Sequence, residues 1–182
     1  MNNSLISTNA QKTLDFLIQN PGRQFLANEI EKSTKLSRAG VNFSLRKLAN
    51  EKLILREKKA KIYLYSVEHN NPIIKQLKVL NTVVLLQPLI NKIKTLSQKI
   101  ILFGSCSRGD NIADSDIDIC ILTNSSPKTI EEKLKAAGPK KNIQFIIRNP
   151  TQFIKMEKEE PVFFGEIERG ITLWELKDES RI

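Results

Sequence analysis

Residues 102–119 read LFGSCSRGDNIADSDIDI, and this stretch is the most informative part of the 182-residue chain. An apolar run leads into Gly104 and Ser105, and two carboxylates follow at alternate positions, Asp116 and Asp118. Glycine lets a backbone approach a ligand closely, and the free amides of such a turn can bind an anion. The stretch therefore predicts a binding site for a phosphorylated ligand at the end of the strand that precedes Gly104.

The run from Asp116 to Leu122 alternates polar and apolar residues, which predicts a strand with two different faces. Asp116 and Asp118 then share one face, and the isoleucines that alternate with them face a core. Two adjacent carboxylates repel each other, and a hard divalent cation relieves that repulsion. The pair therefore predicts Mg²⁺ bridged to phosphate oxygens; without the glycine turn, two solvated aspartates at a strand entrance would be the competing explanation.

The order Gly-Ser, Arg-Gly and Ser-Asp-hydrophobic-Asp within residues 102–119 resembles the signature of the DNA polymerase β-type nucleotidyltransferases, especially their minimal archaeal and bacterial members. The resemblance covers about residues 88–176. It includes FFGEIERGITLWE at 163–175, which is similar to the last helix and strand of those small domains. It implies a mixed sheet flanked by helices, with a nucleoside triphosphate bound over the sheet.

The resemblance also implies roles for individual residues. Gly104 and Ser105 would contact the β- and γ-phosphates of the nucleotide. Asp116 and Asp118 would be the catalytic residues and the ligands of Mg²⁺.

Arg108 is the third candidate for nucleotide binding, and two roles are open to it. It either reaches phosphate or braces the loop by pairing with a carboxylate such as Asp110 or Asp114. We expect bracing, because a guanidinium fixes the geometry of a carboxylate partner well.

Active members of that family generally add a third carboxylate from a later strand, where it completes the metal site or accepts a proton. The matching strand is predicted at residues 142–148, and its polar face offers Gln144. A shift of register does not recover an acid, because residues 133–156 contain no Asp or Glu. The domain is therefore expected to bind nucleotide and to transfer it slowly or not at all.

Charge divides the chain into two halves. Residues 1–100 contain 17 Lys and Arg against six Asp and Glu, whereas residues 101–182 contain 12 against 14. Clustered cations displace the counterions of a phosphate backbone, so the front half is predicted to bind a polyanion. A basic surface that is merely solvated is the alternative. Cys106 and Cys120 have neither disulfide nor metal-ligand spacing, which favours a reducing, cytoplasmic location.

Three short amphipathic helices are predicted in the front half. Their apolar positions recur at helical spacing: Leu14, Leu17 and Ile18 in the first, Phe25, Leu26 and Ile30 in the second, and Val41, Leu45 and Leu48 in the third. Ser37 precedes the third helix, where its hydroxyl can cap free amides.

Two strands, at 53–56 and 61–65, are predicted to form a hairpin joined by the lysine-rich segment 57–60. Three helices followed by such a hairpin resemble the winged helix-turn-helix domains that bind DNA, over about residues 5–67. The resemblance rests on this pattern of elements and implies duplex DNA as a partner.

The residues predicted to contact duplex DNA are the cations of the third helix and of the hairpin. They are Arg38, Arg46, Lys47, Lys58, Lys59 and Lys61. Phe43 lies on the same helix and either touches a thymine methyl group or packs under the hairpin; we expect the second.

The sequence therefore predicts an α+β protein with a winged-helix domain at 1–70, a helical connector at 71–87 and a nucleotidyltransferase-like domain at 88–182. Pro88 is expected to start or kink the helix after the connector. The connector is apolar on more than one stripe, so it is expected to pack either against both domains or against a second copy of the chain, since many winged-helix proteins form homodimers. The most apolar stretch, Val79–Ile90, is too short to span a bilayer, so no membrane partner is expected.

Two functions are compatible with these features. In the first, a DNA-binding protein binds Mg²⁺ and a nucleoside triphosphate and transfers a nucleoside monophosphate to a hydroxyl of a protein or small molecule. In the second, a transcriptional regulator has kept nucleotide or partner binding and lost most catalysis, for which Gln144 is the main support. Minimal family members often pair with a small helical protein as toxin and antitoxin, so the resemblance also implies an antitoxin-like, partner-binding role.

Overall fold

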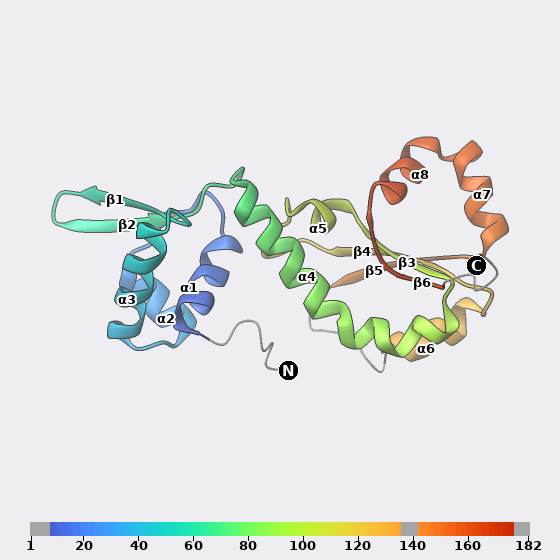
Figure 1. The fold of residues 1–182 in the computed structure, drawn as a ribbon, viewed down its shortest axis with the longest axis horizontal. Coiled ribbons are helices and arrows are strands. Elements are labelled where there is room, and N and C mark those ends of the chain that lie inside the picture. Colours follow the sequence, from blue (N-terminus) through green and yellow to red (C-terminus); the bar gives the residue numbers. More distant parts are fainter. Residues whose placement is uncertain (1–7, 136–141, 177–182) are drawn as a thin grey trace, which may run out of the picture. The chain divides into compact units, whose positions relative to one another are not determined.

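The computed structural model describes residues 8–135 and 142–176, which belong to two compact units (Figure 1). The first unit takes in the chain up to Lys78 and also Asp110–Asp114. The second takes in Val79–Gly109 and the chain from Ser115 onward. The predicted α+β class is confirmed, with a winged-helix-like first unit and a mixed sheet in the second.

Three helices open the first unit. They are α1 (Asn9–Ile18), α2 (Ala27–Thr34) and α3 (Arg38–Asn50). Ser37 caps α3 as predicted, since its Oγ accepts a hydrogen bond from the Gly40 N–H at 3.2 Å. The apolar stripes of α1 and α3 share one core, in which Leu17, Val41 and Leu45 are fully buried.

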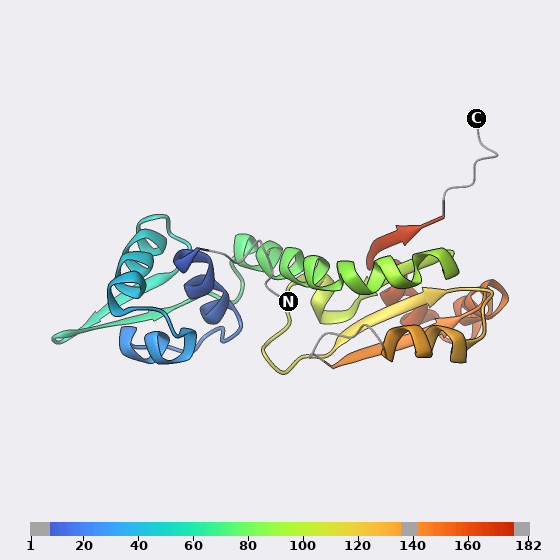
Figure 2. The same cartoon turned by 90° about the horizontal axis from the view of Figure 1, so that it is seen from below.

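A hairpin follows the helices and projects beyond them (Figures 1 and 2). Its strands are β1 (Leu55–Lys59) and β2 (Ile62–Ser66), paired antiparallel. The turn is shorter than the predicted segment 57–60, because it consists of Ala60 and Lys61, and Ala60 adopts a φ of 53°. Lys58 and Lys59 are therefore strand residues.

The sequence pattern placed Phe25 in the second helix, but in the structure Phe25 lies before α2. Its N–H donates to the Tyr65 carbonyl at 2.8 Å and its carbonyl accepts from the Tyr65 N–H at 2.9 Å, so it bridges to β2. The apolar spacing that predicted a helix here is instead used to bury Phe25 against the hairpin.

The second unit is built on a four-stranded mixed sheet. Its strands are β3 (Lys99–Phe103), β4 (Ile117–Leu122), β5 (Ile143–Arg148) and β6 (Ile171–Glu175). They lie in the order β5-β4-β3-β6, with β4 and β5 parallel and β3 antiparallel to both its neighbours. β4 begins one residue later than predicted, so Asp116 stands at its entrance.

Helices cover both faces of this sheet (Figure 1). The elements on one face are α4 (Pro72–Ile93) and α6 (Pro127–Lys135), and those on the other are α7 (Pro150–Glu159) and α8 (Pro161–Glu168). β4 serves both layers, because Ile119 and Ile121 pack toward α4 and α6 while Cys120 packs toward α7 and α8. A 3₁₀ turn (Lys94–Leu96) precedes β3, and the short helix α5 (Gly104–Arg108) follows it.

The helix α4 runs without interruption through the predicted connector and past its end. Pro88 lies inside it, so the expectation that a separate helix starts there is wrong, and the alternative expectation of a kink at Pro88 stays a prediction. The segment Pro72–Leu96 is long and apolar enough to cross a membrane by length and composition, with a mean hydropathy of 1.4, and is longer than the stretch considered from sequence. Its buried side chains belong to protein cores, however: Ile74 to the first core and Leu89 to the second.

Two glycines near the sheet allow a matched test of the packing. A Cβ on Gly170 would lie 2.5 Å from the Leu102 carbonyl oxygen, whereas the nearest atom to a Cβ on Gly165, inside α8, is Arg169 Nη2 at 3.9 Å. We expect Gly170→Ala to lower the free energy of unfolding by about 1–3 kcal/mol through overpacking. Gly165→Ala should raise it by about 0.5–1 kcal/mol, because alanine favours the helix. Urea unfolding followed by circular dichroism provides the measurement, and equal midpoints for the two variants would contradict the expectation.

Candidate functional site

The glycine–serine turn lies at the carboxyl end of β3, where Gly104 closely approaches the carboxylate of Asp118. Gly104 opens α5 with a φ of 67°, a conformation that favours glycine. A Cβ at this position would collide with the carboxylate of Asp118. Ser105 beside it is half-buried. The absence of a side chain at Gly104 thus brings the turn directly onto Asp118.

The two aspartates come together at one end of β4. Asp118 lies in register between Phe103 on β3 and Gln144 on β5. Asp116 precedes the strand, and its carbonyl oxygen accepts a hydrogen bond from the Cys106 thiol at 3.3 Å. The buried thiol thereby links α5 to the segment that carries the first carboxylate.

The environment of Asp118 disfavours its charged form. Burial raises the pKa of the Asp118 carboxyl above its ordinary value, and the negative charges of Asp116 and Glu166 raise it further. The positive charge of Arg108 acts in the opposite direction. A bound cation would offset both the burial and the repulsion.

Gln144 lies beside the carboxylates, as its strand register predicted. Its Nε2 donates a hydrogen bond to Asp116 Oδ2 at 2.6 Å. A glutamine amide donates to a carboxylate but carries no negative charge and accepts no proton at neutral pH. The amide therefore orients Asp116 in a place where a third acid would add charge.

The donor set fits Mg²⁺ held together with a nucleotide. Mg²⁺ usually takes one or two protein carboxylates and completes its shell with phosphate oxygens and water. Asp116 and Asp118 supply two carboxylates, and no cluster of three or more His, Cys, Asp or Glu suited to a metal occurs among residues 8–135 and 142–176. The arrangement thus suits a cation that arrives with phosphates better than a cation bound by protein groups alone.

Arg108 forms an ion pair that sequence reasoning missed. Its Nη1 lies 3.4 Å from Glu166 Oε1 on α8, a carboxylate that the sequence did not suggest beside the expected bracing partners Asp110 and Asp114. Asp110 pairs with Lys75 at 2.9 Å. Glu166 is 58 residues away in sequence, so local spacing carried no signal for it. The pair is more than 40% exposed on both sides, which leaves the guanidinium accessible to a ligand.

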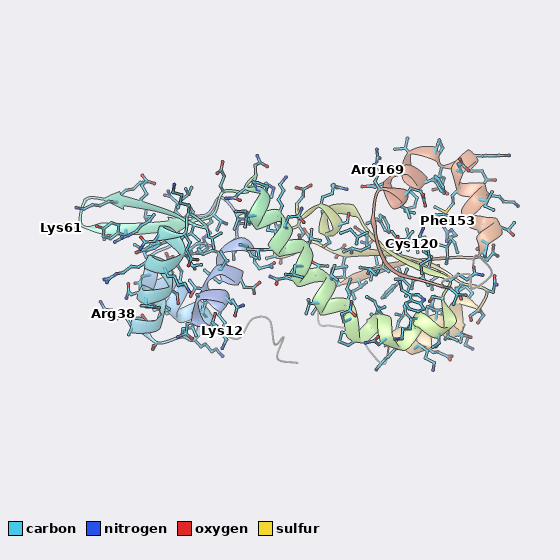
Figure 3. The ribbon with its side chains drawn as sticks, in the orientation of Figure 1. Lys12, Arg38, Lys61, Cys120, Phe153 and Arg169 are labelled. Carbon is cyan, nitrogen blue, oxygen red and sulfur yellow. The ribbon has the colours of Figure 1, made fainter. Side chains whose placement is uncertain are left out.

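The predicted DNA-contacting residues of α3 all lie on its exposed side. Arg38 begins the helix (Figure 3), and Arg46 and Lys47 follow it by about two turns in the sequence of the helix. Phe43 is 72% exposed, so the expectation that it packs under the hairpin is wrong. α3 therefore presents a large apolar side chain among cations.

The hairpin carries the remaining predicted cations. Lys61 is in the turn (Figure 3), and Lys58 and Lys59 are exposed on β1. Sequence reasoning passed over Arg56, whose guanidinium stacks over the ring of Tyr63 at 3.8 Å from its centroid. We call the exposed cations of α3 and the hairpin, together with Phe43, the basic surface.

Comparison with known proteins locates a family in the second half of the chain. Residues 86–173 match a family described as a nucleotidyltransferase domain. No curated protein matches the sequence. Among solved structures, the chain is similar to a "Possible transcriptional regulator from Methanosarcina mazei Go1", with 20% identity and a TM-score of 0.34 over 49% of this chain and 81% of that chain. We call the group of residues around the two aspartates the carboxylate site; its members are Gly104, Ser105, Arg108, Asp116, Asp118 and Gln144. The range of the family match includes all of them.

The raised pKa of Asp118 leads to a stability prediction. Asp118→Asn should raise the melting temperature of the metal-free protein at neutral pH, because it removes a partly buried carboxylate that Asp116 repels. The wild type should lose stability as pH rises from the ordinary Asp pKa of 3.8 through the raised folded value, and the variant should not. Differential scanning fluorimetry provides the measurement, with Asp114→Asn, at an exposed aspartate, as the control. A lower melting temperature for Asp118→Asn than for this control would refute it.

Proposed function

Since residues 86–173 carry a nucleotidyltransferase domain, we propose that this chain is a DNA-binding protein that binds Mg²⁺ and a nucleoside triphosphate in that domain. We further propose that it transfers a nucleoside monophosphate to a hydroxyl group of a protein or small molecule. The observation that carries the proposal is the close approach of Gly104 to Asp118, which brings the backbone of the turn against one carboxylate of the pair. That approach favours a ligand that contains both phosphate groups and a metal ion. A nucleoside triphosphate with Mg²⁺ is such a ligand.

Each residue of the carboxylate site has a role in this proposal. Gly104 and Ser105 bind the β- and γ-phosphates, and Arg108 orients the polyphosphate from the side of α8. Asp116 and Asp118 hold Mg²⁺, which offsets the charge that develops on the phosphates when it is bound. Gln144 orients Asp116 through the hydrogen bond to Oδ2.

The reaction forms one bond to phosphorus and breaks another. The acceptor hydroxyl oxygen attacks the α-phosphorus, the bond from that phosphorus to the bridging oxygen of the β-phosphate breaks, and pyrophosphate leaves. The hydroxyl proton passes to solvent, because the neutral Gln144 amide does not accept it. We therefore expect transfer to be slow.

Gln144 favours a second candidate function. Because its amide occupies an oxygen of Asp116 without adding charge, the site is suited to holding a nucleotide without rapid chemistry. In this version the chain is a transcriptional regulator whose domain senses a nucleotide. The rate of nucleotide transfer separates the two candidates.

Incubation with Mg²⁺ and each nucleoside triphosphate, carrying the radioactive label on its α-phosphate, tests the site. Asp116→Asn and Asp118→Asn should abolish protein or acceptor labelling and reduce nucleotide binding at least tenfold, because each removes a ligand of Mg²⁺. Gln144→Glu should raise the labelling rate by about 10²–10⁴-fold if a missing acid limits proton transfer. Asp114→Asn is the matched control.

The outcomes of this experiment divide cleanly. Wild-type binding that is unchanged in both aspartate variants would rule out the assigned site. Tight binding with no labelling, in the wild type and in Gln144→Glu, would favour the nucleotide-sensing regulator.

Duplex DNA is the proposed partner of the first unit. The support comes from the three helices and hairpin, the exposed cations Arg38, Arg46 and Lys47 on α3, and the lysines of the hairpin. Neutralising phosphates releases counterions, so such a surface binds DNA more tightly at low salt. We propose that binding takes place in the cytoplasm, where the buried thiols of Cys106 and Cys120 stay reduced.

Reversing the charge of the hairpin lysines tests the DNA partner. The triple variant Lys58→Glu, Lys59→Glu and Lys61→Glu should bind a short duplex more weakly. The slope of log K against log salt should fall by about 0.9 for each DNA phosphate that the variant no longer neutralises. Fluorescence anisotropy across salt concentrations provides the measurement. The control is Lys128→Glu, Lys155→Glu and Lys158→Glu, three exposed lysines of the second unit; equal weakening in both triple variants would refute a specific role for the hairpin.

A further inference from the structure

The loop Asp110–Asp114 connects α5 to the segment that carries Asp116. Both its neighbours in sequence, Gly109 and Ser115, belong to the second unit, but the loop itself belongs to the first. The chain that joins Arg108 to Asp116 in the carboxylate site therefore passes through a segment of the proposed DNA-binding unit. The inference drawn from this rests on the proposed function.

Three contacts within the first unit hold the loop. Lys78 Nζ donates a hydrogen bond to the Asn111 carbonyl at 2.8 Å, and Lys75 Nζ lies 2.9 Å from Asp110 Oδ1. The Ala113 N–H donates to the Gln19 carbonyl at 3.1 Å. The loop is thus fixed near both its ends, to α4 and to the end of α1.

The hydrogen bond of Lys78 is buried. Lys78 is 1% exposed and Asn111 is 2% exposed. An ammonium group removed from water needs polar partners, and withdrawing the Asn111 carbonyl would leave the ammonium with one fewer. Displacing the loop from the first unit is therefore unfavourable.

The distances along the chain are short. Only Gly109 separates Arg108 from the anchored Asp110, and two residues separate the anchored Ala113 from Asp116. Consecutive Cα atoms are about 3.8 Å apart, so a movement of Arg108 or Asp116 toward a bound nucleotide pulls directly on the loop. The loop in turn contacts Gln19, at the end of α1, and α1 shares its core with α3.

We propose that Lys75 and Lys78 are positioning residues for the carboxylate site, and that they couple nucleotide binding to DNA binding through the loop Asp110–Asp114. Nucleotide bound at Asp116 and Arg108 changes the loop, and the loop changes how α1 supports α3. By linkage, DNA bound to the first unit changes nucleotide affinity by the same factor.

The test measures both affinities in the full chain. The DNA probe is a short nonspecific duplex at low salt, and the nucleotides are the four ribonucleoside triphosphates with Mg²⁺. In the wild type we expect saturating nucleotide to change DNA affinity at least about fivefold, the lower end of typical coupling. Duplex DNA should change nucleotide affinity equally.

The variant Lys78→Met keeps the apolar length of the side chain and removes its charge. We expect it to bind DNA as the wild type does without nucleotide, and to show less than a twofold change of DNA affinity when nucleotide is added. Lys78→Arg should restore part of the coupling. Lys92→Met, at an exposed lysine of the same helix, is the control that should retain all of it.

If Lys78→Met fails to fold, Lys75→Ala and Asp110→Asn take its place, because that pair is about one-third exposed on both sides. Each should weaken the coupling at least twofold without loss of the melting transition. Nucleotide binding with unchanged DNA affinity in the wild type would overturn the coupling alone. Failure of the wild type to bind any nucleotide would overturn the proposed function and, with it, the coupling.

Discussion

The close approach of Gly104 to Asp118 is the constraint on which the carboxylate site depends. The backbone at Gly104 occupies the space that a side chain would need, and its φ of 67° favours glycine. This places the start of α5 over the ends of β3 and β4 at once. The geometry follows from strand pairing, since Asp118 stands opposite Phe103, the residue before the turn.

The alternation of β4 lets one short strand serve two purposes. Asp118 and Cys120 face the layer of α7 and α8, while Ile119 and Ile121 fill the core beneath α4 and α6. Burial in the apolar core beneath α7 and α8 raises the pKa of Cys120 to about 12, so the thiol stays protonated and packs as an apolar group. The repulsive carboxylates are thus confined to the strand entrance, and the rest of β4 stabilises the sheet.

Local chemistry could be predicted from the sequence, whereas long-range contacts could be predicted only where the family resemblance implied them. Ser37 caps α3 as expected, because capping depends on neighbours in sequence, and Gln144 meets Asp116, 28 residues away, as the resemblance implied. Phe25, Phe43 and Glu166 were misjudged or missed, because their partners or their exposure depend on packing between distant segments. The family resemblances carried by the sequence implied the α+β class and the mixed sheet, but nothing local in residues 110–114 indicated that this loop belongs to the first unit.

The discontinuity of the first unit has a consequence for how such a chain can arise or be recombined. A unit that ends at Lys78 and resumes at Asp110 cannot be exchanged between proteins by a single crossover, since five of its residues lie inside the neighbouring domain. A crossover at residue 79 would leave Lys78 facing a foreign loop. The two units are therefore expected to be inherited together, and an exchange of the first unit would have to replace residues 110–114 as well as the chain up to Lys78.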